Sequence, residues 1–380
     1  MEIFDIIVLT ALLFGISIYG LFKSLKGQQQ LSVRDILHGS RVSVLSSALA
    51  VCSGIISAVS ILGFPAEIYY QGGMPIWFGL AYFIAFPIVA FVLLPVLYDL
   101  KFTSIYEYLE KRFSFACRLL ASLTFCLQMF LYISVALYAP ALALSSITQI
   151  PLALSILITA GLSALYVSLG GAKAGIYTSS LQMALILVCL AFIFICSLIK
   201  INLSEIFSRA KLNGRLELMD FRIDPRIRHS VWSIVIGAIG TIISLFATNQ
   251  LSVQRYLAMP SLRHAQWVVL LNIPINFMVL TLYTGISLII FAFYYNCDPG
   301  LISKDRLFPY FIVNQFSSFP GLVGLFIASV FSAGMSTLSA SYSALSAVII
   351  EDVIRQYLLK MRNGTQLNAN LAVKLARTLR

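Results

Sequence analysis

Two apolar stretches of the chain carry columns of hydroxyl side chains that could bind a hard cation. In the first, spacings of seven, four and three residues place four serines on one helical face, namely Ser46, Ser53, Ser57 and Ser60. In the second, hydroxyls recur every three or four residues: Ser329, Ser332, Ser336, Ser339, Ser343 and Ser346, flanked by Thr337 and Ser341. An alkali ion prefers several oxygen ligands, which hydroxyls and unwound backbone carbonyls can supply. The two columns therefore suggest a cation path.

Close packing of membrane helices explains the same columns without any ion. Small residues let helices approach in a membrane, and hydroxyls can bond across the contact. Both interpretations stay open on spacing alone. A break in one helix would favour the cation, because it frees backbone carbonyls, and Gly54, Gly63 and Pro65 predict such a break in the first hydroxyl-bearing helix.

A second stretch shows the same combination of glycines and polar groups. Gly237 and Gly240 are expected to interrupt a helix at 231–254. That helix also carries Thr241, Ser244, Thr248, Asn249 and Gln250. Inverted-repeat transporters place binding residues on such a pair of broken helices. A glycine-mediated packing contact explains Gly237 and Gly240 equally well.

Charged and metal-binding side chains are scarce where chemistry would need them. No Asp, Glu, Lys or Arg lies in the core of any predicted span, which favours sodium over protons as a coupling ion. The histidines His38, His229 and His264 show no metal-ligand spacing, and the six cysteines show no disulfide framework. A membrane-embedded enzyme is disfavoured because no base lies at membrane depth. The absence of a Walker motif argues against ATP-driven transport.

The composition requires a membrane to hold these elements. The chain has 380 residues, of which 59% are hydrophobic and 11% charged, with a mean hydropathy of +0.92. Such a chain cannot bury its apolar surface in water, so a soluble enzyme is excluded. Charge-free stretches predict an all-α membrane protein with about nine spans. The predicted helices are 3–22, 44–64, 75–97, 118–146, 152–169, 175–199, 231–254, 266–294 and 320–350, within a transporter domain at 1–362.

The distribution of basic residues sets the expected orientation. With the N-terminus outside, most of the 26 Lys and Arg residues lie in inside segments, as the positive-inside rule requires. The net charge of +11 is therefore a topology signal, and no nucleic-acid partner is expected. We expect a multi-pass protein of the plasma membrane with an extracellular N-terminus. Residues 363–380 form either a basic cytoplasmic tail or a truncated linker into a further span.

Several motifs resemble the sodium–solute symporter family, and more narrowly its monocarboxylate, multivitamin and iodide branch. They are Ser57–Tyr69, Thr103–Phe113, Leu137–Leu144, Gly170–Thr178, Asn249–Tyr256 and Ser336–Ser341, followed by Glu351 and Asp352. The resemblance implies a LeuT-type inverted-repeat helical bundle behind one extra leading helix. The second repeat would be incomplete in this chain, because only three of its helices are predicted here.

The resemblance also implies where solutes bind. A sodium ion would take the carbonyls of Ser53, Ile56 and Ala333 and the hydroxyls of Ser336 and Thr337. The substrate region would involve Ser57, Ser60, Tyr132, Phe246 and Asn249, although Tyr132 and Phe246 suit ordinary core packing equally well. One position departs from the family pattern. Ser179 stands where the family usually has an acid on the sodium path, so sodium affinity, release or stoichiometry is expected to differ.

These observations predict a sodium-coupled symporter that imports a small organic anion across the plasma membrane by alternating access. The anion would be a monocarboxylate or a vitamin-like carboxylate, and sodium would be co-transported. The partners implied are therefore the anion, Na⁺ and the lipid bilayer. The alternative is a truncated, non-transporting membrane isoform or scaffold.

Overall fold

The computed structural model describes residues 3–356 except 26–41, 101, 103, 149 and 225, and gives no side-chain detail for 21, 23–25 and 162–174. The described residues contain helices and no strand. The first group is α1 (Ile3–Leu25), α3 (Val44–Ile55), α4 (Ala58–Gln71), η1 (Met74–Trp77), α5 (Phe78–Ile88), η2 (Val89–Leu93), α6 (Leu94–Asp99), α7 (Glu107–Arg112), α8 (Phe115–Thr148) and α9 (Leu152–Lys200). The second is α10 (Leu203–Leu212), α11 (Val231–Ala247), α12 (Gln250–Leu257), α13 (Leu262–Tyr294), η3 (Lys304–Arg306), α14 (Leu307–Phe316), α15 (Leu322–Val348) and η4 (Ile349–Ile354). The segment 363–380 lies outside the described residues.

The helices have the length and composition of membrane spans. In the described part of the chain, six are long and apolar enough to cross a bilayer, and two bent pairs raise the number to eight. The apolar segment Leu152–Gly161, which opens α9, is shorter. Many large apolar side chains are exposed on these helices, among them Phe14, Leu127 and Ile199. Such a surface suits lipid and not water.

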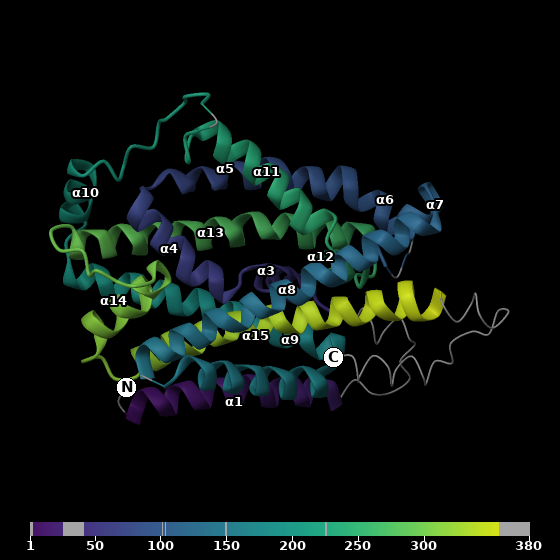
Figure 1. The fold of residues 1–380 in the computed structure, drawn as a ribbon, viewed down its shortest axis with the longest axis horizontal. Coiled ribbons are helices and arrows are strands. Elements are labelled where there is room, and N and C mark those ends of the chain that lie inside the picture. The colour runs from purple at the N-terminus through teal and green to yellow at the C-terminus, as the bar shows by residue number, and fades with distance from the viewer. Residues whose placement is uncertain are drawn as a thin grey trace.

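The hydroxyl-rich helix α15 forms the centre of the bundle. Its span is 94% buried, whereas the span of α1 is 17% buried. It packs against α1, α3, α8 and α9, and in Figure 1 it runs between α8 and α1. The N-terminal end of α15 is held by α1, because Asp5 Oδ1 accepts hydrogen bonds from the backbone of Gly321 and Gly324 at 3.1 and 3.2 Å.

Helix α9 differs from the sequence prediction. We expected separate helices at 152–169 and 175–199, yet helical backbone runs without interruption from Leu152 to Lys200. The segment between them contains no proline, and glycine lowers helix stability by about 1 kcal/mol without forbidding the conformation.

Both expected broken helices are broken, but the second one breaks at an unexpected place. The pair α3 and α4 bends by 65° at Ile56 and Ser57, within the region that Gly54, Gly63 and Pro65 indicated. The pair α11 and α12 bends by 53° after Ala247. Gly237 and Gly240 do not interrupt α11, which is continuous from Val231 to Ala247. Isolated glycines are tolerated in a helix, and a polar N-cap further along defines the real break.

Candidate cation and solute site

The break between α3 and α4 exposes backbone groups inside the bundle. Helix α3 ends at Ile55, and Ile56 has an extended conformation with φ −72° and ψ 98°. Ser57 then starts α4 as its N-cap, with φ −96° and ψ 171° and no side-chain capping bond. Ile56 and Ser57 are buried. Carbonyls in the last turn of a helix lack partners from their own helix, so this break can offer oxygen ligands.

Helix α15 presents hydroxyls to this break. The Ser336 hydroxyl is 2.8 Å from the Ser53 carbonyl oxygen and 2.9 Å from that of Ala333, so it can donate to either. The Thr337 hydroxyl donates to the Ala333 carbonyl at 3.0 Å. Ser53, Ala333, Ser336 and Thr337 are all fully buried. Four of the five predicted sodium ligands therefore lie at one contact between the two helices.

The chemistry of this contact suits an alkali ion. Its groups are neutral hydroxyl and carbonyl oxygens, which are the ligands that hard cations prefer. Among the described residues, no group of three or more His, Cys, Asp or Glu side chains is placed to hold a metal ion. A monovalent ion fits such an uncharged oxygen cluster better than a transition metal does. The fifth predicted ligand, Ile56, lies at the break itself.

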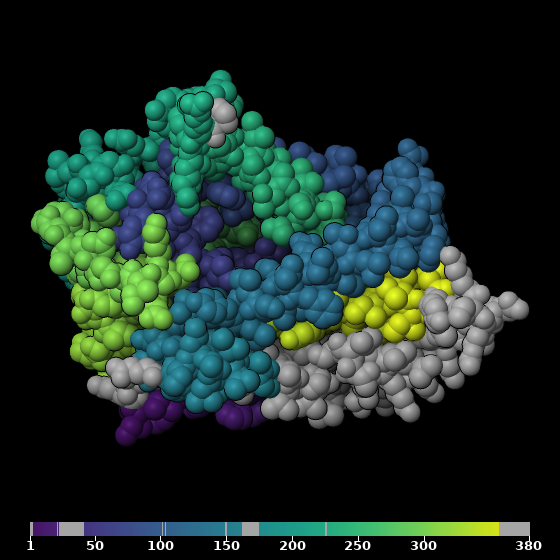
Figure 2. All heavy atoms as spheres, viewed as in Figure 1, coloured from purple at the N-terminus to yellow at the C-terminus, as the bar shows by residue number. Residues whose placement is uncertain are grey.

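A cavity of about 170 Å³ adjoins the break on the side of α4. Its walls come from α3, α4, α5, α11 and α13, and Ile56, Ser60 and Phe246 line it. Figure 2 shows the surface hollowed between α4, α8 and α11. Because Ile56 belongs both to the break and to the cavity wall, an ion and a small solute could bind next to each other.

Three predicted substrate residues lie elsewhere. Ser57 is the N-cap of α4 and lies within hydrogen-bonding reach of the Tyr132 hydroxyl on α8, but neither residue is part of the cavity wall. Asn249 caps α12, and its Oδ1 accepts the Leu251 N–H at 3.0 Å. The carboxamide of Asn249 is therefore used to begin a helix. Ser60 and Phe246 are the predicted substrate residues that the structure brings to the cavity.

Three polar cavity residues were missed by sequence reasoning, namely Tyr82, Asn276 and Tyr283. A fourth, Thr241, was among the polar groups noted on the second glycine-containing helix. Asn276 Nδ2 donates to the Asn272 carbonyl one turn earlier at 2.8 Å, and the Tyr283 hydroxyl lies near Ser60. An amide in the middle of the apolar stretch 266–294 was a signal that could have found Asn276. The cavity is otherwise apolar, with neutral polar groups to orient a solute.

The Ser179 position is buried in α9. Ser179 is fully buried, and its hydroxyl has no hydrogen-bond partner among the described residues. Gln182, one turn later, is also fully buried, and neither polar atom of its side chain has a partner in the same part of the chain. A buried neutral hydroxyl thus occupies the position where the resemblance implied an acid.

Ion pairs hold the loop before α11 against α4. Glu67 on α4 binds Arg228 through both carboxylate oxygens, at 2.7 and 2.9 Å, and lies 3.2 Å from His229. Burial lowers the pKa of His229, with Glu67 raising and Arg228 lowering it further. His229 is therefore neutral at neutral pH. These contacts connect α4 to the segment that leads into α11, and the cavity lies between these two helices.

The comparisons with known proteins agree on the family and the fold. The model of the sodium:solute symporter family matches residues 36–375. A sodium-coupled monocarboxylate transporter 1 of Homo sapiens is 35% identical over 93% of this chain and 59% of the relative. A Drosophila melanogaster protein named as a sodium-dependent multivitamin transporter is 36% identical over 92% of this chain.

A solved structure has the same LeuT-like fold. It is a Na⁺-coupled sialic acid symporter in a substrate-bound outward-open state, with a TM-score of 0.91. The match covers 100% of this chain and 79% of that one, at 24% identity. The chain thus spans about three fifths of the length of the curated relatives that it matches.

Proposed function

Because the chain belongs to the sodium:solute symporter family, we propose that it is a sodium-coupled symporter for a small organic anion. The anion is a monocarboxylate or a vitamin-like carboxylate, and sodium travels with it as a second substrate. The names of the relatives support this class of solute. The protein spans the plasma membrane several times with its N-terminus outside, as the distribution of basic residues favours.

The observation that carries the proposal is the contact of Ser336 with Ser53 across two helices. The Ser336 hydroxyl oxygen is within hydrogen-bonding distance of two carbonyl oxygens, those of Ser53 and Ala333. A sodium ion would replace this hydrogen bond by binding both carbonyls and the hydroxyl oxygens of Ser336 and Thr337. The ion would then connect α3 to α15, so its binding favours the conformation in which the two helices meet.

The solute binds in the cavity beside the break. No basic side chain lines that cavity, so the negative charge of the solute needs another partner. The N-terminus of α4 and the bound sodium ion supply positive potential at the break. This arrangement makes solute binding depend on sodium. Sodium entry along the membrane potential supplies about 2.3 kcal/mol per charge per 100 mV.

Alternating access then moves both solutes across the membrane. Sodium and the anion bind while the hollow at the break is open, and the broken helices rock against α8, α9 and α15 to expose the site to the other side. The alternative is a membrane protein that binds sodium without transport. The buried hydroxyl at Ser179, in place of an acid, favours weaker sodium binding or altered stoichiometry in either case.

Uptake into proteoliposomes tests the proposal. The purified 380-residue chain is reconstituted, and a panel of labelled monocarboxylates, biotin and iodide is offered with and without a sodium gradient. We expect uptake of one class that requires sodium and that Thr337→Val reduces while Thr337→Ser preserves it. Sodium-dependent thermal stabilisation without any uptake would support the non-transporting alternative. Absence of both effects would overturn the sodium site itself.

A further inference from the structure

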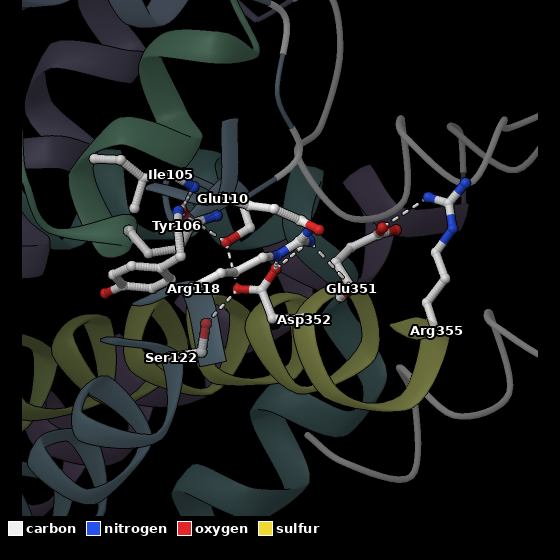
Figure 3. A network of polar contacts seen from close by, with 10 residues as sticks. Ile105, Tyr106, Glu110, Arg118, Ser122, Glu351, Asp352 and Arg355 are labelled. Atoms are coloured by element: carbon white, nitrogen blue, oxygen red, sulfur yellow. Dashed lines mark hydrogen bonds and ion pairs between the residues drawn. The ribbon is translucent and has the colours of Figure 1, made fainter. Parts of the chain in front are cut away.

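A buried charge cluster joins three segments at the end of the molecule opposite α10 and α14. Asp352 of η4 is fully buried and accepts hydrogen bonds from the hydroxyls of Ser104 at 2.6 Å and Ser122 at 2.8 Å. It also accepts from Arg118 Nε at 2.8 Å and from Arg118 Nη2. Figure 3 shows Arg118 and Ser122 reaching the Asp352 carboxylate from different sides. We call this set the Asp352 cluster.

The charges in the Asp352 cluster are matched and hard to separate. Arg118 is buried at the start of α8, and its Nη1 binds Glu110 of α7 at 2.6 Å. Its Nη2 also reaches the Glu351 carbonyl at 3.3 Å. Separating a buried ion pair leaves an uncompensated charge in an apolar interior, which is far more costly than breaking a neutral hydrogen bond. The Asp352 cluster therefore fixes α7, α8, η4 and Ser104 as one body.

One neutral hydrogen bond leads from this body to the second broken pair. The Ile105 N–H donates to Gln250 Oε1 at 2.9 Å, and Gln250 is the first residue of α12. The Tyr106 N–H donates to the Ser104 hydroxyl at 3.2 Å, so the same serine that binds Asp352 also shapes the turn that presents Ile105. Gln250 is fully buried at this contact.

The gap beside this bond is closed. The space between α9, α12 and α15 holds a cavity of only about 20 Å³, lined by Gly175, Leu251, Arg255, Ser339 and Ser343 among others. Leu251 of α12 packs in one hydrophobic cluster with Leu338 and Ala340 of α15. The described conformation is thus closed where α12 packs against α15.

We propose that Gln250 is a positioning residue for transport, whose hydrogen bond to Ile105 latches α12 onto the Asp352 cluster while that end is closed. The proposal rests on the proposed function, because alternating access requires α12 to leave this contact when the closed end opens. The strong ion pairs stay with the static body, and the weak neutral bond is the one that breaks. Removing it raises the population of the conformation open at this end.

Thiol labelling of a residue in the closed gap measures this population. Ser343→Cys is introduced into a Cys117→Ser, Cys297→Ser background, and the chain is placed in nanodiscs so that a polar maleimide reaches both ends. Gln250→Leu removes the acceptor, and we expect labelling of the cysteine to become about fivefold faster.

Gln266→Leu is the matched control, since Gln266 donates a comparable bond to the Ala90 carbonyl at 3.2 Å away from the gap. It should leave the labelling rate unchanged. An unchanged rate in a folded Gln250→Leu chain, or an equal rise in Gln266→Leu, would overturn the latch. If Gln250→Leu does not fold, Gln250→Met, which keeps the side-chain length, replaces it.

Sodium should slow labelling of the parent. A rise with Gln250→Leu, but no sodium effect, would support the latch and contradict sodium coupling.

Discussion

The two bent helix pairs differ in where the backbone groups at their breaks find hydrogen-bond partners. At the break between α3 and α4, the Ser53 carbonyl accepts from Ser336, which lies 283 residues away on α15. At the break between α11 and α12, the Leu245 carbonyl accepts from the Ser252 hydroxyl at 2.8 Å, only seven residues away. Asn249 caps the start of α12 from within the same segment. The carbonyl at the first break is bonded by a distant helix, whereas the Leu245 carbonyl and the Leu251 N–H at the second are bonded within their own segment.

This difference assigns the breaks separate tasks. A cation that replaces the Ser336 hydrogen bond changes a contact between helices, so its binding energy can alter the conformation. At the second break the Leu245 carbonyl and the Leu251 N–H are satisfied locally, so these bonds fix the direction of α12 and place Gln250 where it accepts the Ile105 N–H. Matched substitutions at the two breaks test whether only the first break affects sodium binding.

The largest effect on sodium affinity is expected from Ser336 at the first break, with Ser252 at the second break as its matched control. Ser336→Ala removes a hydroxyl ligand and should weaken sodium binding by about 100-fold, since even outer-shell partners of a metal contribute 10- to 100-fold. Ser252→Ala removes a comparable hydroxyl from the second break and should leave sodium affinity within about twofold. Sodium titration of thermal stability in both variants measures the affinities. Equal losses would show that the breaks do not differ.

A smaller effect is expected where α15 packs against α8. A Cβ on Gly334 would lie 2.5 Å from Cγ of Pro140, whose ring cannot move aside. Gly334→Ala should therefore destabilise the protein by about 2 kcal/mol, as overpacking does. Gly240→Ala is the control in the second pair, because a Cβ there has nothing within 4 Å among the described residues. The midpoints of thermal unfolding in detergent compare the two variants, and similar midpoints would contradict the rigid wall.

The cap of the second break should affect stability without affecting sodium. Asn249→Ala removes the acceptor for the Leu251 N–H and should cost about 1 kcal/mol, the usual value of an N-cap. Asn249→Ser should recover most of this loss. Sodium affinity, measured by the same titration, should stay unchanged in both. A drop in sodium affinity with Asn249→Ala would show that Asn249 also affects the ion site, although the sequence had placed it in the substrate region.

The smallest effect concerns the glycines that do not break α11. A Cβ on Gly237 also has nothing within 4 Å among the described residues. Gly237→Ala should raise the stability by up to about 1 kcal/mol, because alanine favours a helix over glycine. The thermal midpoint measures this gain. A loss of stability would mean that α11 needs the flexibility of Gly237 and that the break reaches back from Thr248 into α11.

The sodium contact was predictable because periodicity determines which residues share a helical face. The columns that include Ser53 and Ser336 follow from spacing, and the structure places these two residues 2.8 Å apart. The bend near Gly54 and Pro65 was also predicted. Most helix bounds followed from apolar length, which the bilayer dictates. The roles of Ser336 and Thr337 as ligands stay predictions.

Contacts between segments distant in sequence were not predictable. Nothing in the local pattern pairs Arg118 with Asp352, which are 234 residues apart, or assigns the Asn249 side chain to a cap. The cavity residues Thr241 and Tyr283 come from different helices and share no motif. The position of the break between α11 and α12 depends on which polar side chain caps the next helix. The three-dimensional geometry decides between the candidate caps.

The burial of α15 has a consequence for biosynthesis. Its 18-residue hydropathy of 1.7 is the lowest of the six long spans, and its serines would meet hydrocarbon if it left the translocon alone. Its packing partners α1, α3, α8 and α9 all precede it in the chain and so leave the ribosome first. The helices that cover α15 are thus synthesised before α15 itself. Variants in which these helices assemble slowly should be degraded before they can fold.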